Sequence, residues 1–319
     1  MPKAFEEINY RLRPAKSVER NMMTDLLLRI PSVQPMSRYR YIGFGSPFFT
    51  DVKSFHEKLH IDDIISIERE DDERERFEFN KPFDCVDLRF GKSTEVLPEI
   101  EWDEPTILWL DYTDQLTTYM LSDIREFVTN APEDSLLFVT INAHPSTPNP
   151  SGDDGDNLTM MEKLEENLSR EVIPEDVTRK DLRGWGYGKV CRRIMLNQIQ
   201  EKFLPTRNAG TTESDLRFEQ LLNIRYSDGA KMRTVGGILT RSDITQTELG
   251  PNLDEISYVK RGTEAYNLKT PTLTFDEMRS LNKQLPTDPS NIDSHAPNRH
   301  VERYAELYRY FPKFVESEI

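Results

Sequence analysis

A short apolar run that opens into a glycine turn constrains the fold of this chain more than any other sequence feature. Residues 38–55 read RYRYIGFGSPFFTDVKSF, with Gly43 and Gly45 at the turn. The two glycines allow a sharp bend and a close approach to a ligand, and free N–H groups at a helix N-terminus favour an anion or a carboxylate. Ser46 suits the N-cap of that helix and Pro47 its first position. The stretch therefore predicts a strand, a ligand-binding turn and a helix.

The residues after the turn predict a helix that lies on a sheet and then a second strand. Apolar residues recur at helical spacing at Phe48, Val52, Phe55 and Leu59. The next apolar run, DDIISIERE, ends at Glu68, and an acid at the end of the second strand is where Rossmann-type sheets bind a ribose diol. Glu68 follows Gly43 by 25 residues and the third fingerprint glycine is missing. A tight turn followed by a solvated acidic stretch is therefore the competing interpretation.

Three more apolar runs alternate with helical patterns. A third strand is expected before the turn at residues 89–93, a fourth at residues 107–110 and a fifth at residues 136–141. Strands separated by helices at this rhythm are typical of a parallel, doubly wound sheet. The ligands of such sheets bind beyond the carboxyl ends of the strands. Those ends carry residues 43–46, Glu68, Asp111, Tyr112 and residues 142–144.

The second half of the chain predicts an antiparallel end to the sheet. Residues 218–241 read as two strands joined at an Asp-Gly pair, a strong hairpin signal. Before them, residues 145–157 form a polar loop, which is either a mobile surface segment or an active-site lid. A helix is expected at about residues 158–171. The glycine- and tryptophan-containing stretch at residues 184–188 either closes on substrate or packs inward as a connector before a further helix.

The first 40 residues are basic, in contrast to the rest of the chain. They contain eight Lys or Arg residues and four Asp or Glu residues, a balance of +4. Val18, Met22 and Leu26 repeat at helical spacing, which predicts a helix docked by its apolar face ahead of the first strand. Arg13 and Lys16 either reach into the ligand cleft or pair with acidic groups on the surface of the domain.

Composition narrows the classes of function. The chain has 319 residues with 41 Lys or Arg and 56 Asp or Glu, a net charge of −15 that repels phosphate backbones. Nucleic-acid binding is therefore disfavoured, although the net charge leaves room for a local basic patch. The sequence has neither a run of about 20 apolar residues nor the apolar core of a signal peptide, so we expect a soluble, cytoplasmic protein. Cys85 and Cys191 have neither metal-ligand spacing nor the number typical of a disulfide framework.

The glycine turn, the acid ending the second strand, the Asp-Tyr pair ending the fourth and the closing hairpin together resemble the class I S-adenosylmethionine-dependent methyltransferases. More narrowly, the strings INYRLRPAKSVERNM, YIGFGSPFF, SIERE and LWLDYTDQL resemble a family of bacterial O-methyltransferases, over about residues 8–285. The resemblance implies a Rossmann-like α/β fold, in which a doubly wound, mostly parallel sheet is closed by an antiparallel hairpin and carries helical N- and C-terminal extensions. It also implies S-adenosylmethionine as the cofactor and an oxygen or nitrogen of an unidentified acceptor as the methylated atom.

The resemblance assigns cofactor contacts by position. They fall on Gly43, Gly45, Ser46, Glu68, Phe90, Gly91, Lys92, Ser93, Asp111 and Tyr112. In this assignment the glycine turn lies by the methionine part, Glu68 holds the ribose hydroxyls and the turn at residues 90–93 lies by the adenine. Asp111 and Tyr112 line the reaction chamber. Lys92 stands where such proteins often have an acid that reads the adenine amine.

Methyl transfer from a sulfonium is an in-line displacement, so the protein must align the two reactants, exclude water and remove a proton from a hydroxyl or amine acceptor. A positioned base contributes roughly 10²- to 10⁴-fold to such a reaction. We expect Asp111 to be the base or the group that orients the acceptor, with His144 as the second candidate. Lys16 or Arg13 would bind an anionic acceptor. The competing interpretation of Asp111 is a helix N-cap after the fourth strand.

A second motif points to different chemistry. Residues 56–60, HEKLH, match H-E-x-x-H, which on a helix places two imidazoles on one face for zinc, with the glutamate as a base. Lys58 places a charge where such helices are apolar, and the helix must end at His60 to leave room for the second strand. We therefore expect no metal here, and a zinc metallopeptidase is the less favoured alternative. A catalytically silent interaction subunit with the same fold is the other one.

The residue patterns divide the chain into a basic helical segment at 1–37, a methyltransferase-like domain at 38–250 and a C-terminal extension at 251–319. Residues 280–300 are rich in Pro, Asn, Asp and Ser, which predicts an extended linker. Beyond it, one face of a helix carries Val301, Tyr304, Leu307, Tyr308 and Phe311. A short helix does not stay folded in water by itself, so this face must pack on its own domain, on a second copy or on another protein. We expect the acceptor to be a small molecule or a protein rather than a nucleic acid, and we expect no membrane partner.

Overall fold

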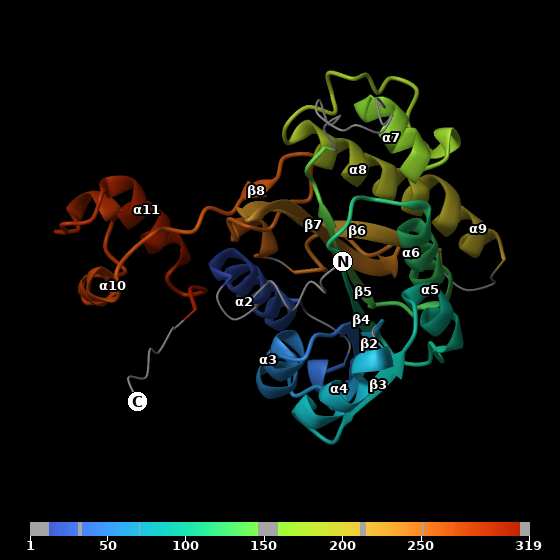
Figure 1. Cartoon of the computed structure of the whole chain (residues 1–319), viewed down its shortest axis with the longest axis horizontal. Helices are drawn as coiled ribbons and strands as arrows, with labels where there is room; N and C mark the ends of the chain where they lie inside the picture. Colours follow the sequence, from blue (N-terminus) through green and yellow to red (C-terminus); the bar gives the residue numbers. More distant parts are fainter. Residues whose placement is uncertain are drawn as a thin grey trace.

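An eight-stranded sheet forms the centre of the protein, with the strand order β3-β2-β1-β4-β5-β7-β6-β8 (Figure 1). The computed structural model describes residues 13–30, 34–69, 71–145, 159–210, 215–250 and 252–312. The strands are β1 (Arg40–Phe44), β2 (Asp63–Glu68), β3 (Val86–Phe90), β4 (Thr106–Asp111), β5 (Leu136–Asn142), β6 (Leu216–Asp228), β7 (Ala230–Arg241) and β8 (Tyr266–Asn267). Of these strands only β7 runs antiparallel to its neighbours, β5 and β6. The predicted fold class, a mostly parallel sheet closed by an antiparallel hairpin, is confirmed.

The strand order reverses between β1 and β4. From β1 the chain moves outward through β2 to β3, and it then returns to β4 on the other side of β1. Such a reversal leaves a crevice outside the carboxyl ends of the two central strands, because the connections leave on opposite faces of the sheet. The glycine turn follows β1 and Asp111 ends β4, so both flank this crevice.

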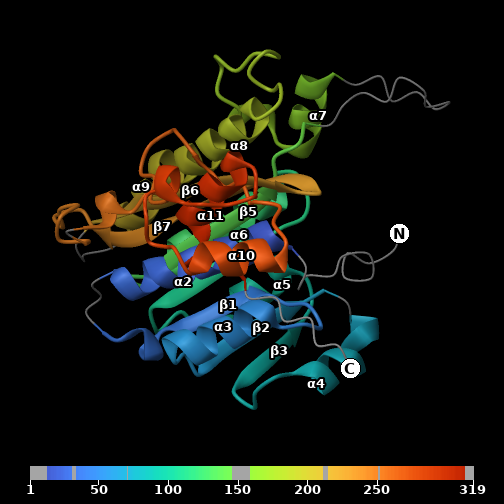
Figure 2. The same cartoon turned by 90° about the vertical axis from the view of Figure 1, so that its left-hand side faces the viewer.

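Helices cover both faces of the sheet, and Figure 2 looks onto the face that carries α2 and α3. One face carries α2 (Pro14–Arg29), α3 (Thr50–Leu59) and α4 (Arg74–Asn80). The other carries α5 (Ser93–Val96), α6 (Thr118–Asn130), α7 (Met160–Asn167), α8 (Gly186–Asn197) and α9 (Leu204–Ala209), with a π-helical stretch at Gln198–Phe203 between α8 and α9. Two further helices, α10 (Phe275–Asn282) and α11 (Asn298–Leu307), belong to the C-terminal extension. No helix in these described ranges has the length and apolar character needed to span a bilayer.

The predicted N-terminal helix is confirmed as α2. Pro14 occupies its first turn, where a missing N–H costs nothing. Val18, Met22 and Leu26 are buried against the sheet, so the helix is held by its apolar face. The start of the predicted segment, residues 1–12, lies outside the described residues.

The helix after the glycine turn begins later than the capping residues predict. Ser46 and Pro47 are not its N-cap and first residue, since α3 starts at Thr50 with Phe49 as its N-cap. Phe49 is fully buried and has a left-handed backbone with φ of 47°, so the burial of this ring outweighs the local preference at Ser46. Phe49 also takes the core position predicted for Phe48.

The second half differs from the predicted elements at two helices. α7 covers Met160–Asn167 and is shorter than the helix expected at residues 158–171, because the backbone at Leu168 is extended. The helix expected after residues 184–188 begins earlier, at Gly186. The polar loop predicted at 145–157 lies, apart from Pro145, outside the described residues.

The C-terminal extension folds into a small helical unit beside α2 (Figure 1). The predicted extended linker at 280–300 is wrong: Leu281 and Ala296 are buried in a small core with Val301 and Tyr304 of α11. Most residues of this stretch are polar, so its few buried apolar residues form no recognisable pattern in the sequence. The unit is tied to α2 because the Tyr310 hydroxyl donates to Asp25 Oδ2 at 3.0 Å.

The outer edge of β6 is covered by an irregular segment rather than by a long strand. β8 pairs with only two residues of β6. Next to it, the amide nitrogen of Gln220 donates to the carbonyls of Lys260 and Gly262. The amide nitrogen of Asn223 donates to the carbonyls of residues 262–264. Buried side-chain amides thus hold residues 260–264 along the strand.

Candidate active site

A small cavity lies at the crevice between the carboxyl ends of β1 and β4. It is formed by α2, the glycine turn, the start of α3, the end of β4 and the β6–β7 hairpin. Of the residues predicted from sequence, it brings together Arg13, Lys16, Gly45, Ser46, Asp111 and Tyr112. Its volume is about 70 Å³, well below the roughly 300–1,000 Å³ of a small-molecule pocket. Side chains of these elements, Lys16 and Arg20 of α2 among them, therefore leave little open space at the crevice in this structure.

Gly43 lies inside β1 rather than at the predicted turn, and Gly45 follows the strand. Both positions need glycine because other groups occupy the space of a side chain. A Cβ on Gly45 would lie 1.6 Å from Glu68 Oε1, and one on Gly43 would lie 2.2 Å from the Tyr41 hydroxyl. The N–H of Gly45 donates to the carbonyl of Ile67 at 3.2 Å, which extends the pairing of β1 with β2. The glycine turn and the acid that ends β2 are therefore in direct contact.

Glu68 is almost completely buried beneath this turn, with 2% of its surface exposed. Burial raises the pKa of its carboxyl to about 8, and the nearby charge of Asp51 acts in the same direction. The Ser66 hydroxyl, which donates to Oε1 at 2.8 Å, opposes the rise. At neutral pH the carboxyl is therefore mostly protonated and can both donate and accept a hydrogen bond.

Asp51 and Arg20 are site residues that the sequence patterns did not single out. Both line the cavity. Asp51, in the first turn of α3, accepts a hydrogen bond from the buried hydroxyl of Tyr41. Arg20, on α2, is buried, and its Nε has no hydrogen-bond partner among the described residues. Neither residue belongs to a local sequence motif. Each reaches the cavity only because α2 and α3 pack beside the ends of the strands.

Lys16 and Asp111 form an ion pair at the end of β4. Lys16 Nζ donates to Asp111 Oδ1 at 2.7 Å, and it lies 2.9 Å from Glu19 Oε2. It also lies 4.3 Å from the centre of the Trp109 ring. The Lys16 side chain is 3% exposed and that of Asp111 is 30% exposed. Lys16 is therefore neutralised by two carboxylates, while Asp111 keeps contact with the crevice.

Glu19 links the Lys16–Asp111 pair to the β6–β7 hairpin. It is fully buried, and it accepts hydrogen bonds from the hydroxyl of Tyr226 at 3.1 Å and from that of Thr234. Both partners belong to the β6–β7 hairpin. The position of Lys16 over β4 thus depends on contacts between α2 and the hairpin.

Tyr112 and Ser93 meet on a third residue, Asp123 of α6. The hydroxyls of Tyr112 and Ser93 each donate to Asp123 Oδ2 at 2.5 Å. Asp123 is 1% exposed, and burial raises its pKa although the two hydrogen bonds partly oppose the rise. This carboxyl was missed by sequence reasoning. Asp123 places a carboxyl beside the turn at residues 90–93. In that turn the chain has Lys92 where the resemblance would lead us to expect an acid.

The turn at residues 90–93 lies next to Glu68. Phe90 pairs with Glu68 in the register of β2 and β3, and the N–H of Gly91 donates to the Glu68 carbonyl at 2.9 Å. Arg74 of α4 lies 3.9 Å from the centre of the Phe90 ring. Lys92 is exposed and lies 3.7 Å from Glu95. The residues predicted to contact the ribose and the adenine are thus neighbours in the structure.

His144 is not among the residues that line the small cavity. Its side chain turns toward the chain that follows, with Nδ1 2.8 Å from the carbonyl oxygen of Pro145. The amide of Gln115 donates to the His144 carbonyl at 2.6 Å. In this structure Asp111 therefore lies closer to the crevice than His144, and the two stay alternative predictions for the base.

The H-E-x-x-H motif does not place two imidazoles on one helical face. His60 follows α3 in a left-handed conformation with φ of 58°. His56 lies near Asp62 and Cys85, with ligand-type atoms all within 4.8 Å. However, its Nδ1 lies 2.9 Å from the carbonyl of Ile61. Since a carbonyl oxygen only accepts, Nδ1 of His56 is the donor in this bond and links the end of α3 to the start of the next segment.

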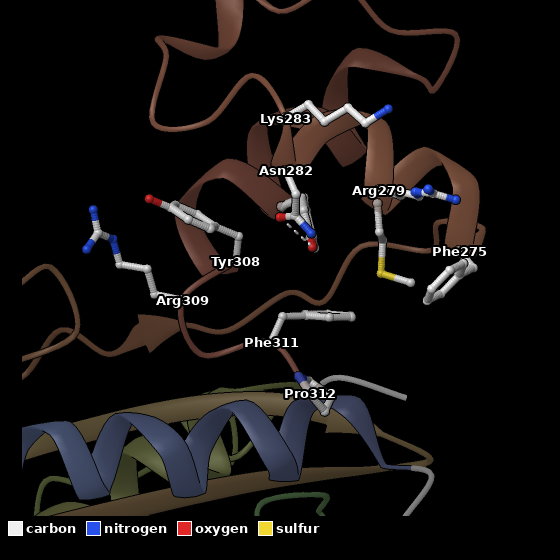
Figure 3. Close-up of a pocket in the computed structure, with 10 residues that line it drawn as sticks. Phe275, Arg279, Asn282, Lys283, Tyr308, Arg309, Phe311 and Pro312 are labelled. Carbon is white, nitrogen blue, oxygen red and sulfur yellow. Dashed lines mark hydrogen bonds between the residues drawn. The ribbon is translucent and has the colours of Figure 1, made fainter. Parts of the chain in front are cut away.

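A larger hollow lies in the C-terminal unit, away from the strand ends. It has a volume of about 750 Å³ and lies between α10 and the end of α11 (Figure 3). The ring of Phe311 points into it toward Phe275, whose surface is 65% exposed. We call this hollow the C-terminal groove. Its lining residues are Phe275, Met278, Arg279, Asn282, Lys283, Tyr304, Tyr308, Arg309, Phe311 and Pro312.

The fold and the crevice define a class of protein, the class I methyltransferases: a parallel sheet with one antiparallel strand, a glycine turn after β1 and a buried acid at the end of β2. A family model narrows this class. The family described as "Putative O-methyltransferase" matches residues 8–319, so the chain belongs to that family. No curated protein matches the chain.

The solved structures that match the chain are distant in sequence. Trm1 from Pyrococcus horikoshii, in complex with S-adenosyl-L-methionine, is 10% identical with a TM-score of 0.48, over 97% of this chain and 79% of that one. The O-methyltransferase TomG from Streptomyces achromogenes, in complex with the same compound, is 14% identical with a TM-score of 0.35, over 70% of this chain and 79% of that one. An O-methyltransferase from Bacillus cereus is 13% identical with a TM-score of 0.32, over 70% of this chain and 90% of that one. The family match, rather than these structures, carries the assignment.

Proposed function

We propose that this protein transfers a methyl group from S-adenosylmethionine to an oxygen or nitrogen atom of its acceptor, in the bacterial cytoplasm. The observation that carries the proposal is the contact between the buried Glu68 and the glycine turn, whose Gly45 and Ser46 line the same cavity as Lys16 and Asp111. The family match over residues 8–319 supports the same activity.

The residues around the crevice fit the chemistry of the cofactor. A protonated carboxyl at Glu68 can donate to one ribose hydroxyl and accept from the other. For the methionine part, the unpaired Nε of Arg20 suits the carboxylate and Asp51 suits the ammonium group. Phe90 offers an aromatic ring for the adenine, and Ser93 a hydroxyl that Asp123 holds in place.

The chain's own groups supply alignment and proton removal. S-adenosylmethionine, when bound, supplies an electrophilic methyl group as part of a sulfonium. Asp111 is the base in this proposal: Lys16 holds Oδ1, and the other carboxylate oxygen is the one that takes a proton from the acceptor. Lys16 acts as a positioning residue, because its charge is already shared between Asp111 and Glu19.

Calorimetric titration with S-adenosylmethionine and S-adenosylhomocysteine tests the proposal. We expect both to bind the wild-type protein and to bind Glu68→Ala at least about tenfold more weakly, since the variant loses hydrogen bonds to the ribose. Glu57→Ala, at an exposed position of α3, is the control and should bind normally. Equal affinity in a folded Glu68→Ala protein would contradict the assignment.

We further propose that the C-terminal groove binds an acidic surface of a second copy of the chain. Arg279, Lys283 and Arg309 line the groove together with aromatic rings, and none of the three forms an ion pair with a residue that the structure describes. The chain as a whole has a charge of −15, so a second copy offers complementary acidic groups.

Light scattering tests the role of the groove. The wild-type protein should have the mass of an oligomer, and the double variant Arg279→Glu, Lys283→Glu should have the mass of a monomer, because like charges then meet at the interface. Arg299→Glu, on α11 but outside the groove, is the control. The same mass for all three proteins would exclude the groove as a self-association surface.

A further inference from the structure

Three basic side chains gather on one face of the β6–β7 hairpin, close to its turn. Arg225 and Arg233 are directly opposite each other in the register, and Lys231 precedes Arg233 by two residues on the same face. Like charges at opposite positions destabilise a sheet. Within the described part of the chain none of the three has an ion-pair partner. The acid whose charge acts on Arg233, Glu264, lies 3.3 Å from Lys189 instead.

Arg233 is fully buried, with 0% of its surface exposed. Its Nη2 donates to Asn223 Oδ1 at 2.7 Å. Its Nε and Nη1, and Nε of Arg225, are buried without an acceptor among the described residues. Burial, together with the charges of Arg192 and Arg225, lowers the pKa of Arg233 to about 10, so the side chain stays charged at neutral pH. A buried cation with unsatisfied N–H groups is unfavourable unless an anion completes its bonding.

The first turn of α8 lies against the same arginine. A Cβ on Gly188 would come within 3.2 Å of Arg233 Cδ. The helix has 12 residues, and the free N–H groups and dipole at its N-terminus favour an anion. Trp185, which precedes the helix, lies 5.2 Å from the guanidinium of Arg225 and 5.7 Å from Nζ of Lys231. A helix N-terminus, three cations and one aromatic ring therefore come together beside the hairpin.

This cluster lies at the same edge of the sheet as the crevice. Asp111 of β4 pairs with Thr140 of β5. The next strand, β7, places Thr234 opposite Thr140, and Arg233 is the neighbour of Thr234. Two strand spacings amount to about 10 Å along the sheet, and an acceptor that reaches from the cluster to Asp111 has to pass around the carboxyl ends of the strands. Arg233 faces α8, whereas Asp111 faces α2, on the other side of the sheet.

We propose that Arg233, Arg225 and Lys231, with the first turn of α8, bind the anionic group of the methyl acceptor, which is a carboxylate or a phosphate. A guanidinium group presents paired N–H donors that match two oxygens of either group. The proposal rests on the proposed methyl transfer and narrows its acceptor to an anionic molecule. In this proposal the ring of Trp185 packs against the portion of the acceptor that adjoins its anionic group.

Thermal unfolding of the full chain at constant ionic strength, in sodium chloride, inorganic phosphate or malonate, tests the site. For the wild-type protein we expect phosphate or malonate to raise Tm by about 2 °C or more above chloride. The anion that acts at the lower concentration identifies the group as phosphate or carboxylate. In Arg233→Gln we expect no such rise, and a Tm in chloride equal to or above that of wild type, because a buried unpaired charge is gone.

Two more variants keep the test decisive if Arg233→Gln folds poorly. Lys231→Gln, at a half-buried position, should lose more than half of the anion-induced rise and keep its Tm in chloride. Arg193→Gln is the matched control on α8: Arg193 pairs with Asp176 on the surface at 2.7 Å, and the variant should keep the full rise.

The site is overturned if neither anion raises the Tm of wild type, or if the rise persists in both Arg233→Gln and Lys231→Gln. An equal loss of Tm for Arg233→Gln in all three salts would also overturn it, since the arginine would then have an internal counter-charge. Calorimetry with S-adenosylmethionine on the same samples separates the two proposals. Cofactor binding without an anion response refutes the anion site alone, and an anion response without cofactor binding refutes methyl transfer alone.

Discussion

Glu68 is a carboxyl held in its protonated form by the fold. Its pKa of about 8 means that the folded state binds the proton more tightly than the unfolded chain, in which the group titrates near 4.5. The stability that this proton binding contributes is complete below about pH 4.5 and is lost as the pH rises to about 8. Above that range both states are ionised and the dependence ends.

We expect the Glu68→Gln variant not to show the loss of folding stability that the ionisation of Glu68 causes as the pH rises. Between pH 5 and pH 9 the free energy of unfolding of the variant should rise relative to wild type by on the order of 1–4 kcal/mol. Urea denaturation at the two pH values measures the difference. Glu57→Gln should keep the wild-type dependence, and a Glu68→Gln protein that also keeps it would show that Glu68 ionises normally in the fold.

Asp111→Asn tests the proposed base. The competing interpretation of Asp111 as a helix N-cap is wrong, because the helix after β4 starts at Thr118 with Thr117 as its N-cap. Asparagine keeps the shape of the side chain but cannot take a proton, so methyl transfer to an identified acceptor should fall roughly 10²- to 10⁴-fold. Single-turnover kinetics with saturating cofactor would measure the step, and His144→Asn is the comparison. A wild-type rate for Asp111→Asn combined with a slow His144→Asn would move the role of base to His144.

At the scale of elements, α2 does most to shape the crevice, since it brings Lys16 over β4 and buries Glu19 against the hairpin. Lys16→Met leaves Glu19 buried without its counter-charge, which should destabilise the protein by about 3–5 kcal/mol. Chemical denaturation measures this loss. The double variant Lys16→Met, Glu19→Gln should recover most of it, because the remaining group is neutral, and a double variant as unstable as the single one would contradict the role of this pair.

How far the sequence predicts each element depends on whether its determinants are local. The strands, the hairpin and α2 follow from residue spacing, and the glycine turn and Glu68 follow from the order of motifs. The start of α3 does not, because the burial of Phe49 outweighs the capping preference of Ser46. Asp123 and Asp51 could not be found either. Asp123 meets Ser93 across 30 residues, and nothing near either residue in the sequence signals that contact.

At the scale of the whole molecule, the C-terminal unit has a small core of its own and joins the rest of the protein through both apolar and polar contacts. Leu307 of α11 is buried in the core that α2 and α3 share, and the Tyr266 hydroxyl donates to Glu306 Oε1 at 2.5 Å. Tyr310 adds three contacts: its hydroxyl donates to Asp25, its carbonyl accepts from the Asn21 amide at 2.8 Å and its ring lies 5.5 Å from that of Tyr258. Tyr310 therefore strengthens an attachment to which Leu307 also contributes.

We expect Tyr310→Ala to loosen the unit. Backbone amides of α11 should exchange with solvent faster, by hydrogen-exchange mass spectrometry, whereas those of α6 should not change, because local openings are limited to the elements that lose contacts. Arg309→Ala, at the next residue down the chain, which lines the C-terminal groove, is the control. Unchanged exchange of α11 in Tyr310→Ala would mean that other contacts hold the unit.

The covered outer edge of β6 affects the tendency of this protein to aggregate. β6 is 13 residues long, and a bare strand of that length would offer another chain a template for cross-β growth. The segment that covers this edge makes only a few backbone contacts with β6, at residues 221–225, and the amides of Gln220 and Asn223 hold residues 260–264 of that segment in place. Two amide side chains, remote from the crevice, thereby keep in position the segment that stands between β6 and a strand of another chain.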